Sequence, residues 1–420
     1  MTSCSHCIVD LKDYVFFQEG PGLRKWQWTE AGMKVINVTN ILADGSVDIS
    51  NTSRFISLDE FKGKYSHFAI DAGDVVVASS GNTYGKVGRI KGCHLPIMMN
   101  TSVIRFRPIN PEKLHPDYLY AFLRSDFFRA QIERFVVGSA QPNFGPTHVK
   151  LMQLIMPEWG HQRRIASVIS AYDDLIENNT RRIEILEEMA RRLYEEWFVQ
   201  FRFPGHEGVK FKESELGLIP EDWKVSTLDE FGEIITGKTP SKNNSEFFGG
   251  VVPFIKLPDM HGNTFIIETS ERLSQEGVSS QKTKTIPPGS ICVSCIGTAG
   301  VVVITSEPSQ TNQQINSIVP RAPGLREFLF FSATALKEKI NNYGATGATM
   351  TNLSRGKFAS LQVVEPKEDL LCGYNKLAAP LFDKILCLQK ANRNLRAQRD
   401  LLLPKLISGE IDVSDIPMPT

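Results

Sequence analysis

The sequence has no excess of charge of either sign. Its 47 lysines and arginines balance its 47 aspartates and glutamates, so the formal net charge is zero. A domain that binds nucleic acid usually carries a clear basic excess, and the overall charge therefore argues mildly against DNA binding. Because binding to DNA depends on local phosphate contacts, it would require basic residues gathered in patches.

Long hydrophobic runs are also lacking. No stretch of about 18 apolar residues is present. The N-terminal segment has Asp10, Lys12 and Asp13 where a secretory signal would need an apolar core. These absences predict a cytoplasmic protein with no membrane partner.

Cysteines are few. The chain has seven, an odd number, which favours reduced thiols over a disulfide framework. The pairs Cys4/Cys7 and Cys292/Cys295 have the spacing of zinc ligands. In the alternating segment 290–297, however, positions three apart point to opposite faces of a strand. The sequence therefore predicts no metal site.

Motifs of the catalytic chains that act on DNA are missing as well. The sequence contains neither the NPPF-type motif with which a DNA-amino methyltransferase holds a flipped base nor a glycine-rich cofactor loop. A metal-dependent nuclease needs clustered carboxylates and a lysine, and the carboxylates Asp259 and Glu268 have no such lysine beside them. We expect no catalytic residue and no cofactor on this chain.

One segment does fit a phosphate-binding pattern. Residues 232–239, GEIITGKT, match GxxxxGK[ST]. A phosphate loop leaves a buried strand and enters a helix, but here no apolar run precedes the pattern and PSKNNS follows it. The context favours an ordinary loop, and nucleotide hydrolysis is kept as an alternative function.

What the sequence does contain is an internal repeat. At an offset of 209 residues, segment 138–198 aligns without a gap on segment 347–407, and Asn143, Pro157 and Asp174 meet identical residues. Farther upstream, at a slightly larger offset, GDVVVASSGNTYGKV matches GSICVSCIGTAGVV. Such self-similarity predicts two copies of one structural plan.

Each half is expected to contain a β-rich block, a short helical piece, a loop, one more strand and a long helix. The short helical piece covers residues 116–135 in the first half and 325–340 in the second. Prolines and glycines in the segment that joins the halves break helices, which predicts a linker. The fold class is α+β, with two similar mixed β-rich domains and two long helices.

Heptad rows of apolar residues predict that the two long helices pair with each other. Neither helix has an apolar face wide enough to bury itself, and leucines make one row of the second helix the stronger. The net charge is −1 over 161–202 and +5 over 374–407, which also favours pairing. The predicted core of the pair consists of Ile169, Ile176, Ile183, Leu186, Leu193, Leu381, Ile385, Leu388, Leu395 and Leu402.

Two asparagines interrupt these rows. Asn179 and Asn392 lie at seam positions, where a lone polar residue fixes the register of paired helices at some cost in stability. A helix end or a bend exposed to water is an equally good interpretation.

Four segments together resemble the specificity subunits of type I restriction-modification enzymes. They are LIPEDWKVSTLDEFGEIITGKTPSKN, GATGATMTNLS, NTRRIEILEEMARRLYEEWF and RNLRAQRDLLLPKLISGEID, and the likeness covers essentially the whole chain. The helix phrases and LIPEDW are the specific part, whereas the β-rich blocks are only loosely similar. The first half departs from the pattern, because FQEGPGLRKWQWTEAG stands where a copy of LIPEDW and GKTPS is expected.

The resemblance implies a non-catalytic subunit in which two target recognition domains each read one half of a bipartite, asymmetric DNA target. It implies two antiparallel helices with pseudo-twofold symmetry that set the spacer and dock two methyltransferase subunits, which would carry S-adenosylmethionine. Restriction/translocase subunits complete the implied complex. The expected boundaries are recognition domains at 1–157 and 221–366, spacer helices at 158–202 and 367–410, a linker at 203–220 and a tail at 411–420.

Base reading is expected from loops that carry amides, hydroxyls and basic side chains, since Asn and Gln pair with adenine and Arg and Lys with guanine. For any single residue, an ordinary solvated loop position remains an open interpretation. The candidates in the second half are Lys238, Thr239, Ser241, Lys242, Asn243, Asn312, Gln313, Gln314 and Thr349. Those in the first half are Arg24, Lys25, Ser80, Asn82, Thr83, Tyr84, Lys86 and Gln141.

Two tryptophans near the first of these loops have two interpretations. Trp26 and Trp28 could stack on an exposed or flipped base. Their period-two spacing favours one face of a strand that packs in the core. A coiled-coil adaptor that binds no DNA is kept as a third function, beside the DNA-binding scaffold and the nucleotide hydrolase.

Overall fold

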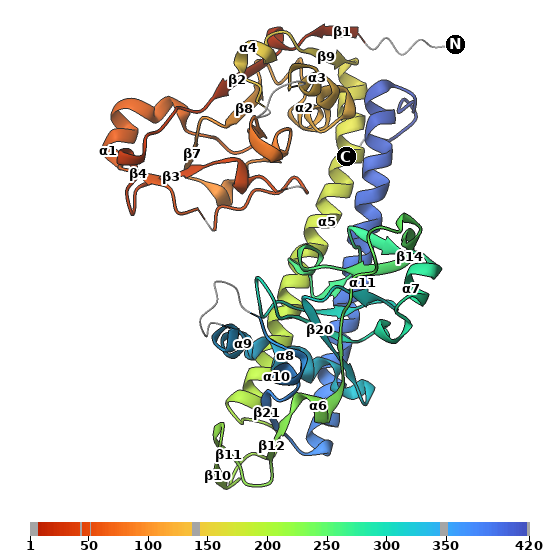
Figure 1. Cartoon of the computed structure of the whole chain (residues 1–420). Coiled ribbons are helices and arrows are strands. Elements are labelled where there is room, and N and C mark those ends of the chain that lie inside the picture. The colour runs from red at the N-terminus through yellow and green to blue at the C-terminus, as the bar shows by residue number, and fades with distance from the viewer. Residues whose placement is uncertain (1–6, 43, 51, 137–142, 345–351, 418–420) are drawn as a thin grey trace. The chain divides into compact units, whose positions relative to one another are not determined.

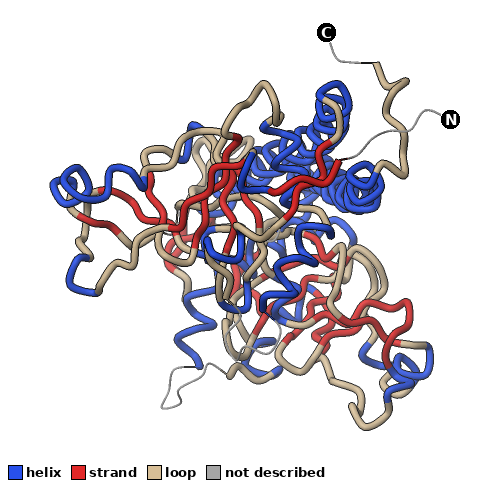
Figure 2. The backbone as a smooth tube through the Cα atoms, turned by 90° about the horizontal axis from the view of Figure 1, so that it is seen from above, coloured by secondary structure: helices blue, strands red, loops and turns tan. Residues whose placement is uncertain are grey.

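The computed structural model describes residues 7–42, 44–50, 52–136, 143–344 and 352–417 (Figure 1). The chain forms two compact units. The first unit contains residues 1–174 and 395–420, and the second contains residues 175–394. In both units short strands and short helices are joined by extended loops (Figure 2).

The first unit contains two small sheets and a separate strand pair. The larger sheet consists, in order, of β2 (Val15–Glu19), β8 (Val103–Pro108), β5 (Val75–Ala78) and β6 (Val87–Arg89). Its neighbouring strands are antiparallel. The smaller sheet consists of β4 (Phe55–Ile56), β3 (Met33–Ile36) and β7 (Ile97–Met99), and β3 is parallel to β7. The separate pair is β1 (Cys7–Asp10) with β9 (Gln153–Met156).

The second unit repeats this plan, with one strand added to its larger sheet. Its larger sheet consists, in order, of β13 (Gly232–Thr236), β20 (Ile315–Pro320), β17 (Ile291–Ser294), β18 (Val302–Thr305) and β15 (Phe265–Ile266). Its smaller sheet consists of β16 (Glu271–Leu273), β14 (Phe248–Ile255) and β19 (Gln310–Thr311), and β14 is parallel to β19. The separate pair is β12 (Lys224–Thr227) with β21 (Gln362–Glu365). The predicted repeat is confirmed, and β15 is an addition to the second copy.

The short helical piece expected in each half is helical, but it is divided into two helices, which was not expected. They are α2 (Pro116–Leu123) and α3 (Asp126–Val136) in the first unit, and α8 (Arg326–Ala335) and α9 (Lys337–Gly344) in the second. Ser125 breaks the first piece, because its buried hydroxyl donates to the carbonyl of Phe122 and accepts from the amide of Phe128. The remaining short helices are α1 (Leu58–Glu60), α4 (Pro146–Val149), α6 (Leu228–Phe231), α7 (Gln275–Ser279) and α10 (Arg355–Ala359).

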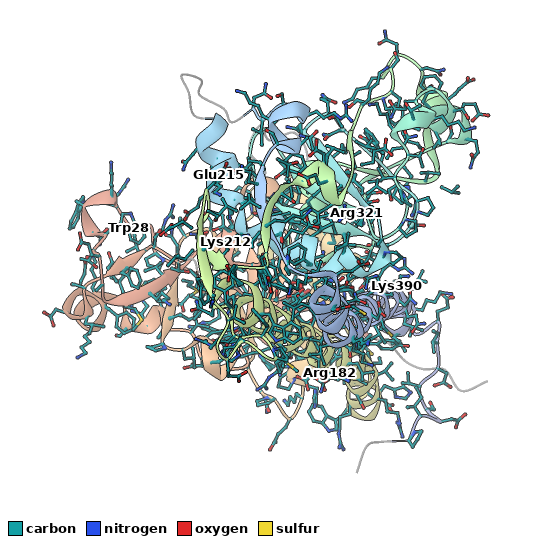
Figure 3. The ribbon with its side chains drawn as sticks, turned by 90° about the horizontal axis from the view of Figure 1, so that it is seen from below. Trp28, Arg182, Lys212, Glu215, Arg321 and Lys390 are labelled. Carbon is teal, nitrogen blue, oxygen red and sulfur yellow. The ribbon has the colours of Figure 1, made fainter. Side chains whose placement is uncertain are left out.

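The segment expected as a linker forms a hairpin. β10 (Phe211–Ser214) and β11 (Gly217–Pro220) are antiparallel, and Lys212 and Glu215 of this hairpin are labelled in Figure 3. Aromatic side chains pack at the open end of the hairpin, where Phe201 contacts both Phe211 and Trp223.

Two long helices, α5 (Trp159–Tyr194) and α11 (Glu368–Ser408), run through both units. In the first unit, Ile165 and Ile169 share a core cluster with Leu403 and Leu406. In the second unit, Ile183 and Ala190 of α5 and the nearby Trp197 share a core cluster with residues of the first half of α11, namely Tyr374, Ile385 and Leu388. The start of one helix therefore packs on the end of the other, and the antiparallel pair is confirmed.

The most buried row of α11 is not the leucine row. Leu381, Leu395 and Leu402 are only half-buried, whereas Asn392 and Arg399 leave 3% and 5% of their surfaces exposed. The expectation that the leucines form the stronger row was wrong, because polar residues in the other row find partners on α5. Ala378, Ile385 and Leu406 complete that buried row.

Asn392 makes three hydrogen bonds to α5 within the second unit. Its Oδ1 accepts from the side chain of Asn179 at 3.0 Å. Its Nδ2 donates to the carbonyl of Ile176 at 3.3 Å and to the hydroxyl of Thr180 at 3.2 Å. In the first unit Arg399 binds Asp173 of α5 at 2.7 Å. Both polar contacts favour one register of the helices.

Among the described residues, no helix is long and apolar enough to cross a membrane.

Candidate nucleic-acid interface

In the second unit, two of the predicted base-reading loops lie against each other. Gly237 follows β13, and its amide donates to the carbonyl of Ile315 at 3.1 Å. A Cβ at this position would stand 2.2 Å from the carbonyl oxygen of Asn312, closer than any side chain permits. The next amide, of Lys238, donates to the carbonyl of Thr311 at 2.9 Å. Because residue 237 is a glycine, the backbone of residues 237–239 can pack directly against segment 311–314.

Side chains also link the two loops. The hydroxyl of Thr239 donates to Oε1 of Gln313 at 2.5 Å. Asn312 is buried, and its amide donates to Oε1 of Gln314 at 3.0 Å, so it holds the loop in shape. Lys238 and Gln313 are exposed and are the polar groups that this site can offer to a ligand.

Gln281 supports the backbone of this site, although no sequence pattern singled it out. Its buried amide donates to the carbonyl of Lys238 and to Oε1 of Gln310, both at 2.7 Å. Because two hydrogen bonds fix the backbone at Lys238, the lysine side chain projects from a rigid position.

A tight turn follows, formed by residues 241–244. The amide of Asn244 donates to the carbonyl of Ser241 at 3.2 Å. The Asn244 side chain accepts from the amide of Glu246 at 3.1 Å. Ser241, Lys242 and Asn243 are all exposed on this turn.

The first unit repeats the glycine contact of this site, although Pro21 and Gly22 stand in place of Lys238 and Thr239. A Cβ on Gly20 would stand 2.3 Å from the carbonyl oxygen of Asn100, and its amide donates to the carbonyl of Val103 at 3.1 Å. Gly20 is therefore the structural counterpart of Gly237. The exposed Thr101 takes the place of Gln313, and neither Gly20 nor Thr101 was selected from the sequence. The constant offset from β2 to β13 was the available signal.

The turn of residues 24–27 in the first unit corresponds to the turn of residues 241–244. The amide of Gln27 donates to the carbonyl of Arg24 at 3.0 Å, as Asn244 does to Ser241. Arg24, Lys25 and Trp26 are exposed. The prediction that Trp26 packs in the core was wrong, because Lys25–Gln27 form a 3-10 turn and not a strand.

Further candidates of the first unit lie in segment 80–86, which follows β5. Ser80 forms a β-bridge with Asn143, and the second unit has the same bridge between Ile296 and Asn352. Tyr84 packs against the core, and Thr83 and Lys86 are half-buried. Gln141, Thr349 and the side chain of Asn82 lie outside the described residues. Among the described residues, no hydrogen bond joins the turn at 24–27 to the segment 80–86.

The structure gives no support to the metal and nucleotide sites weighed from the sequence. Cys292 and Cys295 lie in different core clusters on opposite faces of the sheet. Burial raises the pKa of the Cys292 thiol to about 12 and that of Cys295 to about 11, so both stay protonated. Across the described ranges, no group of three His, Cys, Asp or Glu residues could hold a metal. Residues 232–236 of the phosphate-loop pattern form β13, a geometry that is incompatible with such a loop.

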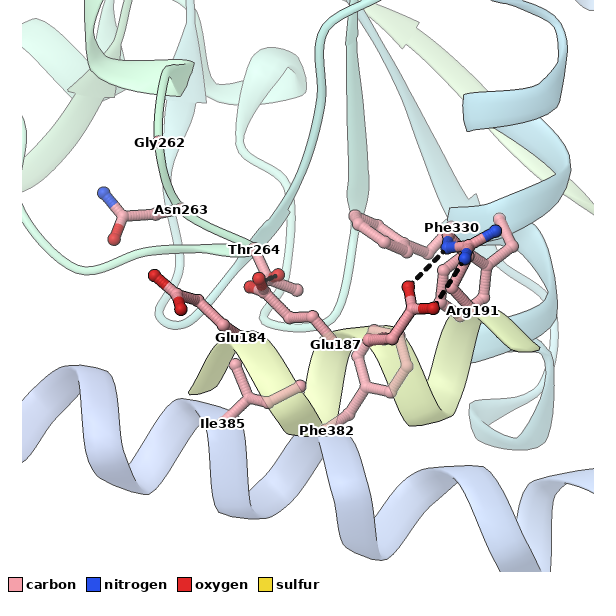
Figure 4. Close-up of a pocket in the computed structure, with 11 residues that line it drawn as sticks. Glu184, Glu187, Arg191, Gly262, Asn263, Thr264, Phe330, Phe382 and Ile385 are labelled. Atoms are coloured by element: carbon pink, nitrogen blue, oxygen red, sulfur yellow. Dashed lines mark hydrogen bonds and ion pairs between the residues drawn. The ribbon is translucent and has the colours of Figure 1, made fainter. Parts of the chain in front are cut away.

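A second kind of surface lies on the helix pair of the second unit. An open pocket of about 500 Å³ is bounded by α5, α8, α11 and the loop 262–264 (Figure 4). Its aromatic wall contains Phe330, Phe331 and Phe382. Three carboxylates stand along its α5 edge, and they are Glu184, Glu187 and Glu188.

The charges at this pocket are only partly balanced. Glu188 pairs with Arg191 at 2.7 Å, the contact drawn in Figure 4. Burial raises the pKa of Glu187, which accepts a hydrogen bond from Thr264. The pocket therefore suits a cationic group that can also contact aromatic rings.

A sequence model described as "Type I restriction modification DNA specificity domain" matches residues 9–188 and 220–369. The HindI specificity subunit of Haemophilus influenzae is 32% identical over 357 residues, which cover 70% of this chain and 77% of that protein. The MjaIX specificity subunit of Methanocaldococcus jannaschii is 26% identical over 318 residues, which cover 74% and 73%.

The fold has a solved counterpart. The S subunit of a type I restriction-modification system from M. genitalium aligns over 97% of both chains with a TM-score of 0.59 and 16% identity. That likeness concerns the fold, and the sequence matches carry the assignment. The chain belongs to the type I restriction-modification DNA specificity family, as a non-catalytic specificity subunit that sets DNA target recognition.

Proposed function

We propose that each unit reads one half of a bipartite, asymmetric DNA target through the loops that surround Gly20 and Gly237. The recognition domains would be residues 1–157 and 221–366. The observation that carries this proposal is the duplication of one site on one strand framework, with different exposed side chains in the two copies. Two readers of the same shape that carry different polar groups suit two half-sites of different sequence.

We further propose that α5 and α11 set the spacer between the half-sites. A helix of 36 residues, such as α5, spans about 54 Å at about 1.5 Å per residue. On B-DNA this length corresponds to about one and a half turns, the scale on which paired half-sites are read. The hydrogen bonds of Asn392 and the ion pair of Arg399 support a helix pair with a single register.

The same helices would dock two methyltransferase subunits, and restriction/translocase subunits would join the full complex. The pocket at Glu184 and Glu187 suits a lysine or arginine side chain of such a subunit. At the positions that the repeat makes equivalent, α11 carries Arg393 and Arg396. The two docking surfaces therefore differ in charge.

A loop exchange tests the reading proposal. The full chain is purified with its modification subunit, and the duplexes that it binds are selected from a random pool. We expect a bipartite target. Replacing residues 238–243 by residues 21–26 should change one half of that target and leave the other half as it is.

Lys212→Ala, on the exposed hairpin, is the matched control and should leave both halves unchanged. A target that is not bipartite, or a change in both halves after the exchange, would contradict the assignment of one half-site to each unit. Nucleotide turnover by the purified chain that is lost in Lys238→Ala would favour the hydrolase instead.

A further inference from the structure

Trp26 is exposed to a degree that is unusual for its size. It leaves 80% of its surface in solvent, whereas Trp197 and Trp223 are buried in the second unit. A tryptophan normally buries its large apolar rings. Its two preceding neighbours, Arg24 and Lys25, are exposed cations. The turn thus presents an indole and two positive charges together.

The turn that carries Trp26 is held firmly on both sides. Gln27 is only 5% exposed, and its side chain accepts from the amide of Arg24 at 2.8 Å and donates to the hydroxyl of Tyr65 at 3.1 Å. Trp28, labelled in Figure 3, packs on the core cluster that contains Met33 and Ile56. With the side chains of Gln27 and Trp28 fixed inward, the backbone of the turn is held in place and Trp26 projects from a rigid position, so a ligand would not have to order the turn.

The repeat gives Trp26 a counterpart. The turns 24–27 and 241–244 close with the same hydrogen bond, and both follow a glycine that abuts a backbone carbonyl. Lys25 therefore corresponds to Lys242, and Trp26 corresponds to Asn243. The cation is shared, but an amide in the second unit is replaced by an indole in the first.

We propose that Trp26 stacks on a base step of the half-site read by the first unit, while Arg24 and Lys25 bind the flanking phosphates. This inference rests on the proposed function, and it names the residue that contacts the bases there. An indole has no hydrogen-bond acceptor with which to read a base edge, but it can insert between base pairs and open a deformable step. Asn243 can instead form hydrogen bonds with a base edge in the groove. The two half-sites would thus be read by different physical means.

The first test measures the affinity of the full chain, with its modification subunit, for its selected duplex. Trp26→Ala should weaken binding about 10- to 100-fold, the range expected when one stacked base is lost. Trp26→Phe keeps a ring and should lose less. Neither variant should alter the dependence of affinity on salt, whereas Lys25→Ala should lower that slope by about one phosphate contact.

The second test follows the quenching of tryptophan fluorescence by acrylamide. The target duplex should protect the wild-type chain and the control Trp159→Phe, and it should give Trp26→Phe no such protection. Wild-type affinity in Trp26→Ala, or full protection in Trp26→Phe, would overturn the stacking role. If the wild-type chain selects no bipartite target, it is the proposed function that fails. If it selects one and Trp26→Ala binds it normally, only the stacking inference fails.

Discussion

The hydrogen bonds of Asn392 allow a quantitative prediction about the helix pair. Replacing Asn392 by alanine removes three hydrogen bonds to α5, and each contributes a net stabilisation of about 0.5–1.5 kcal/mol. Asn179 is half-buried and can form new hydrogen bonds with water. The loss of unfolding free energy should therefore lie toward the lower end of the summed range, at about 2 kcal/mol.

A double variant separates the hydrogen bonds from the packing. Replacing Asn179 and Asn392 together by leucine leaves no polar group without a partner, which is often neutral or stabilising. The repeat supplies an internal reference, since Ile183 and Leu388 occupy the equivalent positions and are buried in one cluster. We expect the double variant to be at least as stable as the wild-type chain, but to bind targets with a wider range of spacers, because one of the two polar contacts that favour a single register is lost.

Urea unfolding followed by far-UV circular dichroism measures both variants. With a slope of about 3 kcal/mol per molar urea, Asn392→Ala should lower the midpoint by about 0.7 M. An unchanged midpoint would mean that these hydrogen bonds carry no net stability. A double leucine variant as unstable as the single alanine variant would refute the argument from the apolar equivalent pair.

Three further predictions concern other parts of the chain. His115 caps α2 by accepting from the amide of Asp117, and burial lowers its pKa, so the unfolded chain binds the proton more readily and stability should fall as the pH drops below about 6.5. His115→Asn, which keeps a cap, should flatten this decline in urea midpoints measured between pH 7.5 and 5.5. Gly237→Ala should cost about 1–3 kcal/mol in a thermal or urea melt, whereas Gly356→Ala, whose added Cβ meets open space, should not destabilise the chain. Inserting one heptad in both α5 and α11 adds about 10 Å and should lengthen the selected spacer by up to roughly three base pairs. An unchanged spacer would show that the length of the helices does not set the spacer.

The sequence predicted the parts of this fold that repeat or that follow a helical period. The self-alignment at 209 residues led to two copies of one plan, and the heptad rows led to the paired helices. The order of strands within each copy could not be read from the sequence, because parallel pairs such as β3 with β7 join segments far apart in the chain.

The errors arose where a local pattern was overridden by tertiary contacts. Leucines outnumber other residues in one row of α11, yet the row with Asn392 and Arg399 is buried, because partners on α5 satisfy these polar groups. The spacing of Trp26 and Trp28 is that of a strand, but the buried side chain of Gln27 closes a turn between them. The residues proposed to contact DNA stay predictions, since which of them meet bases depends on the deformation of the duplex as well as on the loops.

The division of the chain into units has a consequence for its synthesis on the ribosome. The second unit is one continuous stretch, residues 175–394, whereas the first needs residues from 395 onward. The core of the first unit includes Leu403, Leu406, Ile407 and Val413, which are translated after the whole second unit. Domains usually fold in the order of their translation, but here the N-terminal reader cannot complete its core until the whole second unit has been translated. A chain shortened from its C-terminal side to residue 394 would therefore lose part of the core of the first unit and keep every residue of the second.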